Sequence, residues 1–127
     1  MTESPLVARL ICVGQKNLGG VIEIRGPVGE EIVIGRSHER CNVHCNEQRV
    51  SSVHCKLIVK QRHTSVAPQL WIEDLSSNGT FVNAQLIGKG RSVPLSHNDE
   101  VGLLEPCAGE EASDRPPFAY IVLLGAE

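Results

Sequence analysis

Short apolar runs separated by turn-forming residues limit the fold more than any other feature of this chain. Runs such as 20–26 (GVIEIRG) and 55–61 (CKLIVKQ) alternate apolar and polar side chains, the period of two that a half-buried strand requires. Gly, Pro, Asn and Ser stand between the runs, as is typical of turns. No stretch of ten or more residues has a convincing helical repeat. The pattern predicts an all-β sandwich or barrel.

Ten runs qualify as strands, and the last of them differs from the others. Residues 118–124 (FAYIVLL) are apolar on both faces, which indicates a strand buried on both sides. The predicted strands lie within 8–14, 20–26, 30–36, 55–61, 69–75, 80–83, 85–88, 91–95, 99–104 and 118–124.

Length and composition indicate one folded domain. The chain has 127 residues, of which 41% are hydrophobic, enough for a single core. We expect a flexible tail over residues 1–7 and the domain over 8–124. Residues 104–117 are acidic and rich in proline, so we expect a flexible loop there between the last two strands. Whether this loop contributes to binding stays open.

Charge and cysteine content exclude several classes of function. A net charge of −3, with one Trp, one Tyr and two Phe, disfavours a nucleic-acid partner. No apolar run reaches the ~18 residues of a membrane span, so no membrane partner is expected. The N-terminus has no signal-peptide pattern. Five cysteines without such a signal predict reduced thiols in a reducing compartment.

Residues 35–55 concentrate the side chains that bind metals. Cys41-x-x-His44 has a chelating spacing. However, neighbouring side chains on a strand face opposite ways, which separates His44 from Cys45 and His54 from Cys55. There is also no second pair to complete a tetrahedron. We therefore predict no metal site, and a small zinc-binding domain remains an alternative.

The same region contains the parts of a catalytic triad, but not its motif. Ser51 or Ser52 could be combined with His54 and Asp74. The chain lacks the Gly-x-Ser-x-Gly elbow, and residues 88–92 (GKGRS) are too short for a nucleotide-binding loop. We predict that the domain is not an enzyme and that it has no cofactor.

Anion-binding side chains recur after successive predicted strands. Arg36 ends one strand, Ser51 lies in the next polar loop, and Asn78 follows the strand that contains the tryptophan. Guanidinium, hydroxyl and amide groups are the donors that a phosphate group prefers. Loops at one end of a sandwich converge, so these groups could form one site. Alternatively, Asn78 and the following glycine form only a hairpin turn.

The ordered set of these residues resembles the forkhead-associated (FHA) domain. The likeness covers about residues 8–124 and rests on Gly35-Arg36, Ser51-x-x-His54, Asn78-Gly79 and Asn83. It implies a two-sheet antiparallel β-sandwich of about eleven short strands. It also implies a module that binds phosphothreonine in a partner protein and has no catalytic activity of its own.

The resemblance assigns a role to each matching position. Asn78 would hydrogen-bond the peptide backbone. The residues of the structural motif would be Gly35, His54, Gly79 and Asn83, with His54 as a buried bracing side chain. The residues expected to hold the phosphate are Arg36, Ser51, Ser52 and Ser77.

Arg49 has two interpretations that the sequence leaves open. In some relatives, a basic residue here reads the side chain three positions after the phosphothreonine. Arg49 would then favour Asp or Glu at that +3 position. Alternatively, Arg49 is a solvated surface arginine.

Within the family, residues 72–103 are most similar to the FHA domains of checkpoint-type serine/threonine kinases. This implies a kinase domain elsewhere in the parent chain, a role in signalling such as the DNA-damage response, and a nuclear location, with the cytoplasm as a further one. Self-association through a phosphorylated parent chain stays open. The main alternative is an FHA-like structural or dimerising module that does not bind phosphopeptides.

Overall fold

The computed structural model describes residues 5–61, 67–105 and 116–125, and within these ranges the regular structure consists only of strands. The strands are β1 (Leu6–Cys12), β2 (Val21–Arg25), β3 (Glu31–Gly35), β4 (Val43–His44), β5 (Cys55–Lys60), β6 (Gln69–Asp74), β7 (Thr80–Val82), β8 (Gln85–Leu86), β9 (Ser92–Pro94), β10 (Glu100–Leu103) and β11 (Phe118–Leu124).

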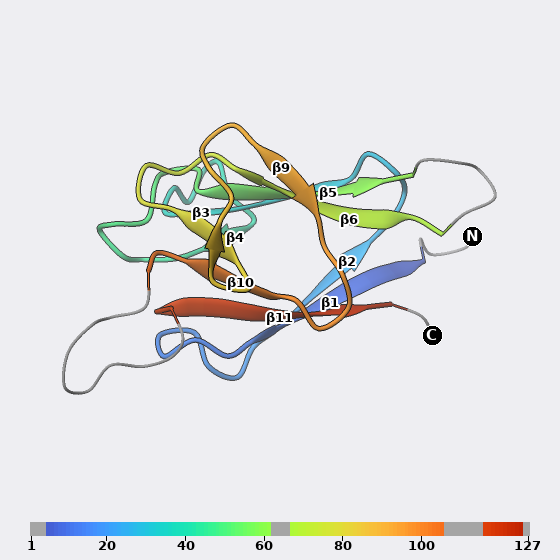
Figure 1. The fold of residues 1–127 in the computed structure, drawn as a ribbon, viewed down its shortest axis with the longest axis horizontal. Coiled ribbons are helices and arrows are strands. Elements are labelled where there is room, and N and C mark those ends of the chain that lie inside the picture. Colours follow the sequence, from blue (N-terminus) through green and yellow to red (C-terminus); the bar gives the residue numbers. More distant parts are fainter. Residues whose placement is uncertain (1–4, 62–66, 106–115, 126–127) are drawn as a thin grey trace.

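The strands form two sheets that stack face to face (Figure 1). The six-stranded sheet has the order β2-β1-β11-β10-β7-β8, and the five-stranded sheet has the order β4-β3-β5-β6-β9. The predicted all-β sandwich is therefore confirmed. One detail needs correction, because β3 and β4 run parallel, whereas a purely antiparallel sandwich was expected. Asn42 explains the pairing, since its backbone and side chain both bond to Val33 and hold β4 beside β3.

Strand boundaries agree with the predicted runs at most positions. The exception is β4, whose two residues are too few to show an alternating pattern. β1 begins at Leu6 and buries Val7, so the last two residues of the expected tail over 1–7 belong to this strand, while residues 1–4 lie outside the described residues. At the predicted loop 104–117, Leu104 is buried and donates its N–H to Gly79 O, while residues 106–115 lie outside the described residues.

The core lies between the sheets and follows the predicted alternation. On β5, Cys55, Leu57 and Val59 are buried, and the intervening side chains are half-buried. The central strand β11 buries consecutive residues from Phe118 onward, as expected for a strand that is apolar on both faces. One reason is that the β1–β2 loop covers its start, where Val13 N–H donates to Ala119 O.

Several loops meet at the end of the sandwich that lies opposite the described chain ends. The β3–β4, β4–β5 and β6–β7 loops gather at the left of Figure 1, and the β1–β2 loop also lies at this end. Hydrogen bonds join these loops to one another. In the part of the chain that the structure describes, there is no helix of the length and hydropathy needed to cross a membrane.

Candidate functional site

Gly35 and Arg36 form the first part of the site, at the end of β3. A Cβ atom on Gly35 would lie 2.4 Å from Ser52 O and 3.0 Å from His54 N, so only glycine fits there. This close approach lets Arg36 N–H donate to Ser51 O at 3.0 Å. The Arg36 Nε donates to Val50 O at 2.9 Å. The guanidinium is thereby oriented, and among the described residues its terminal nitrogens have no hydrogen-bond partner.

His54 joins two of the loops from inside the protein. Its side chain is fully buried, Nδ1 accepts a hydrogen bond from Ser51 N–H at 3.1 Å, and Nε2 lies 2.8 Å from Gly79 O. A backbone N–H can only donate and a carbonyl can only accept, so the ring carries its proton on Nε2. Burial lowers the pKa of His54, against the opposing effect of the Gly79 carbonyl. The ring is therefore a neutral brace.

Ser51 connects the β4–β5 loop to the β6–β7 loop. Its Oγ accepts a hydrogen bond from Ser77 N–H at 3.0 Å, which leaves its own proton available to a ligand. Ser52 is exposed, and its carbonyl accepts from Ser37 N–H at 3.1 Å and from Cys41 Sγ at 3.0 Å. Ser51 and Ser52 thus carry two successive hydroxyl groups on a loop whose backbone is bonded to Arg36 and Ser37.

Asp74 organises the β6–β7 loop. Its buried carboxylate accepts hydrogen bonds from Ser76 N–H at 3.0 Å, Ser76 Oγ at 2.6 Å, Thr80 Oγ1 at 2.9 Å and Gly88 N–H at 3.1 Å. Gly79, at φ +111°, completes the turn and donates its N–H to Ser76 Oγ at 2.9 Å. This hydrogen-bond network fixes the conformation of the loop that carries Ser77 and Asn78.

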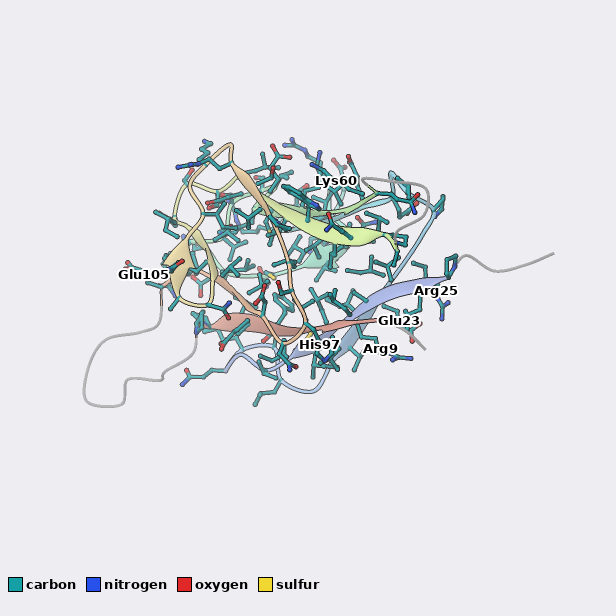
Figure 2. The ribbon with its side chains drawn as sticks, turned by 45° about the vertical axis from the view of Figure 1, so that its right-hand side comes forward. Arg9, Glu23, Arg25, Lys60, His97 and Glu105 are labelled. Atoms are coloured by element: carbon teal, nitrogen blue, oxygen red, sulfur yellow. The ribbon has the colours of Figure 1, made fainter. Side chains whose placement is uncertain are left out.

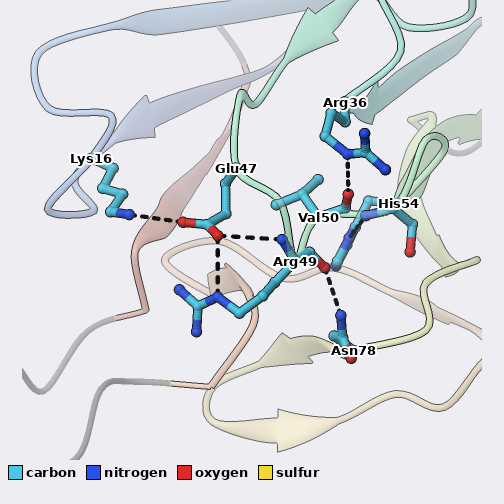
Figure 3. A network of polar contacts seen from close by, with 8 residues as sticks. Lys16, Arg36, Glu47, Arg49, Val50, His54 and Asn78 are labelled. Carbon is cyan, nitrogen blue, oxygen red and sulfur yellow. Dashed lines mark hydrogen bonds and ion pairs between the residues drawn. The ribbon is translucent and has the colours of Figure 1, made fainter.

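Asn78 ties this loop to the loop that carries Arg49. Its Nδ2 donates to Arg49 O at 2.8 Å, and both residues are exposed (Figure 3). Among the residues that the structure describes, the Asn78 Oδ1 atom and the second amide hydrogen have no partner, so both can bond to a ligand. Beside Asn78 opens a groove of about 870 Å³, whose lining includes Ser77, Phe81 and Leu86.

A carboxylate that the sequence did not indicate holds two cations near the site. Glu47 Oε2 lies 3.2 Å from Arg49 Nε, and Glu47 Oε1 lies 2.7 Å from Lys16 Nζ (Figure 3). The Arg49 guanidinium and then the Lys16 ammonium lower the pKa of Glu47 to about 2, so Glu47 is ionised at neutral pH. We call Lys16, Glu47 and Arg49 the charged triad.

The structure gathers most of the sequence-predicted residues but not all of them. Asn83 lies apart from the three loops, in the β7–β8 turn, where it bonds to Asp99 at 2.9 Å and to Glu100 N–H at 3.0 Å. The predicted residues that meet on the three joined loops are Arg36, Arg49, Ser51, Ser52, Ser77 and Asn78.

The metal-ligand and triad residues have other partners. Cys45 Sγ lies 3.5 Å from Tyr120 Oη, and no metal-like cluster of His, Cys, Asp and Glu occurs among the described residues. The His54 ring contacts the backbone of Ser51 and Gly79, whereas Asp74 bonds to other groups. The serine, histidine and aspartate therefore do not form a proton relay.

Comparison with known proteins matches this site and fold to one family. The family profile described as "FHA domain" matches residues 32–103. The meiosis-specific serine/threonine-protein kinase mek1 of Schizosaccharomyces pombe is 35% identical over 98 residues, which are 77% of this chain and 21% of that kinase. The chain spans between 15 and 21% of the length of three such kinases.

Solved structures agree in fold. The crystal structure of the MEK1 FHA domain gives a TM-score of 0.74 at 23% identity and covers 93% of this chain and 89% of that one. The N-terminal FHA domain of S. cerevisiae Rad53p, solved with a phosphothreonine peptide, gives 0.67 at 21% identity and covers 94% of each chain. The chain therefore belongs to the FHA-domain family.

Proposed function

We propose that this FHA domain binds phosphothreonine in a partner protein, through Arg36 and the hydroxyl groups of Ser51, Ser52 and Ser77. The observation that carries the proposal is the fixed position of Arg36 beside Ser51. The backbone N–H of Arg36 donates to Ser51 O, and its Nε donates to Val50 O. The first bond fixes the main chain beside Ser51, and the second orients the guanidinium so that it and the Ser51 hydroxyl could bind one anion. The phosphothreonine complex of the Rad53p FHA domain supports the same class of ligand.

The donors suit a phosphate in number and in charge. A phosphate monoester carries about −1.5 to −2 charges near neutral pH and three acceptor oxygens. One guanidinium with two or three neutral donors satisfies it, and each charge-assisted bond contributes about 1.5–3 kcal/mol before ordering costs. We expect micromolar affinity, about −8 kcal/mol. Donors that are already held in place lose little entropy on binding.

Asn78 and Arg49 extend the proposed site along the peptide. Asn78 is exposed beside Ser77 and would bond to the peptide backbone next to the phosphothreonine. Arg49 would read an acidic side chain at +3. Support for this comes from its exposed side chain and from its carbonyl, which is bonded to Asn78.

The parent protein is a further part of the proposal. We further propose that the parent protein is a checkpoint-type serine/threonine kinase that acts in nuclear signalling. The serine/threonine-protein kinases among the relatives of this domain support a kinase as the parent protein. The work of the domain would be phosphorylation-dependent recruitment, including recruitment of a phosphorylated copy of its own parent chain.

A titration with one peptide in three forms tests the function. The peptide carries Asp at +3 and has phosphothreonine, phosphoserine or threonine at the central position. We expect the phosphothreonine form to bind best and Arg36→Ala to abolish binding. Arg25→Ala is the matched control, since Arg25 lies at the far end of the sandwich from Glu105, which lines the groove beside Asn78 (Figure 2). If a degenerate phosphothreonine library also fails to bind, the structural-module alternative holds instead.

A further inference from the structure

We propose that Lys16 is a second specificity residue of this domain, which reads an acidic side chain at the +5 position of the phosphopeptide. The inference rests on the proposed function, because it takes the phosphothreonine on Arg36 and Ser51 and the +3 side chain on Arg49 as its starting points. It concerns a residue in the β1–β2 loop, outside the three loops that carry the proposed ligand-binding residues.

The backbone of Lys16 is fixed to the rest of the sandwich. Lys16 N–H donates to Pro117 O at 2.8 Å, and Val13 N–H donates to Ala119 O at 2.9 Å, both at the start of β11. A Cβ on Gly14 would lie 2.5 Å from Ala119 N, so this loop packs closely against β11. Lys16 is therefore presented from a defined position, although it lies 31 residues from Glu47 in sequence.

The spacing of the two cations is compatible with an extended peptide. Lys16 and Arg49 contact different oxygens of the Glu47 carboxylate, at 2.7 and 3.2 Å. Their nitrogens therefore lie at most about 8 Å apart, a range that includes the ~7 Å between alternate side chains of an extended chain. If Arg49 reads +3, Lys16 faces +5 rather than +1, because Lys16 lies on the far side of Glu47 from Arg36 (Figure 3). The +4 side chain points to the opposite face.

The charged triad has a net positive charge, which favours an acidic ligand. Two cations share one carboxylate, so the charged triad has a net charge of +1 while Glu47 is ionised. The Lys16 side chain is 54% exposed and ends a flexible stem, so its ammonium can turn from Glu47 toward a peptide carboxylate. Arg49 should move less than Lys16, because its Nε is bonded to Glu47 and its carbonyl accepts a hydrogen bond from Asn78.

The test is a set of phosphothreonine peptides that differ only at +3, +4 and +5. All carry Asp at +3, with Asp or Asn at +4 and at +5. For the wild type we expect Asp at +5 to bind about threefold more tightly than Asn, the size typical of an exposed ion pair, and little effect at +4. In Lys16→Met, the preference at +5 disappears while the Asn +5 peptide binds as before.

Lys60→Met provides the matched control. Lys60 ends β5, about 16 Å along the strand from Cys55, and its ammonium lies 4.4 Å from the centre of the Trp71 ring. This variant should keep the +5 preference. If Lys16→Met keeps the preference as well, or weakens the Asp and Asn peptides equally, the inference is wrong and phosphothreonine binding stands. If the wild type binds neither these peptides nor a degenerate phosphothreonine library, the proposed function and this inference are both wrong.

Discussion

The Nε2–H of His54 donates a buried hydrogen bond to Gly79 O at 2.8 Å, and so joins the β4–β5 loop to the β6–β7 loop. The other ring nitrogen accepts from Ser51 N–H at 3.1 Å. The two loops that carry Ser51 and Asn78 thus share one support inside the protein. The geometry of the candidate phosphate site depends on a side chain that no ligand touches.

We expect His54→Ala to destabilise the domain by about 2–4 kcal/mol. The substitution leaves a cavity, an unpaired Ser51 N–H and an unpaired Gly79 carbonyl. Urea unfolding measures the loss. His97→Ala is the control, since His97 is exposed and accepts one bond from Leu124 N–H, and it should change stability by less than about 1 kcal/mol. Equal stability of the two variants would contradict the bracing role.

The free energy of unfolding should decrease as the pH is lowered, in two separate pH ranges. His54 has a lowered pKa in the folded state, so below its unfolded value of about 6.5 the unfolded chain binds more protons and stability declines as pH falls. Glu47, with a folded pKa of about 2, adds a second decline below its unfolded value of about 4.5.

Two variants separate these windows when unfolding is followed in urea across pH. His54→Gln keeps a donor and an acceptor but does not titrate, so the decline that begins near pH 6.5 should shrink. Glu47→Gln should reduce only the decline that begins near pH 4.5. A curve for His54→Gln that runs parallel to the wild type between pH 5 and 7 would show that another group is responsible.

Alternating patterns were enough to predict most strands but not the whole topology. Residues 55–60 and 69–74 follow the period of two and form the centre of one sheet, as their pattern indicates. β4 has only two residues, and its parallel pairing depends on Asn42 contacts that no local pattern encodes. Pattern length therefore decides which strands can be found.

The candidate site also contains residues that the sequence could predict and residues that it could not. The order of Arg36, Ser51 and Asn78 along the chain pointed to one site, because loops at one end of a sandwich converge. Lys16 and Glu47 carried no such signal, since their ion pair requires the β1–β2 loop to dock on Pro117. Contacts between loops distant in sequence were visible only in the structure.

Gly35→Ala should destabilise the domain by about 2 kcal/mol or more and weaken phosphopeptide binding. The added methyl group would meet Ser52 O at 2.4 Å. This oxygen accepts a hydrogen bond from Ser37 N–H, so we expect its displacement to disturb the adjacent bond between Arg36 N–H and Ser51 O as well. Urea unfolding and peptide titration measure the two effects. Gly26→Ala is the control, because its nearest contact would be an ordinary 3.8 Å to Pro5. Full binding by Gly35→Ala would show that the site tolerates a shift of this strand end.

Asn78→Asp should weaken phosphothreonine-peptide binding at least about tenfold. The reason is that the variant loses a hydrogen bond to the peptide backbone and gains a charge that repels the phosphate. Asp has nearly the same shape as Asn, but its carboxylate would face Arg49 O, now 2.8 Å from Nδ2, and would repel the phosphate. Because Asn78 is exposed, stability should fall by less than about 1 kcal/mol. Titration calorimetry and urea unfolding separate the two effects.

The control for this change is Asn98→Asp, which adds the same charge on the β9–β10 loop, where Asn98 N–H donates to Val122 O. At φ +72° Asn98 occupies a backbone conformation that Asp also tolerates. This variant should bind the peptide within about twofold of the wild type. At physiological salt the Debye length is about 8 Å, so the interaction between the phosphate and a more distant exposed charge is largely screened. Equal losses in both variants would attribute the effect to net charge, and unchanged affinity in Asn78→Asp would remove Asn78 from the peptide-binding site.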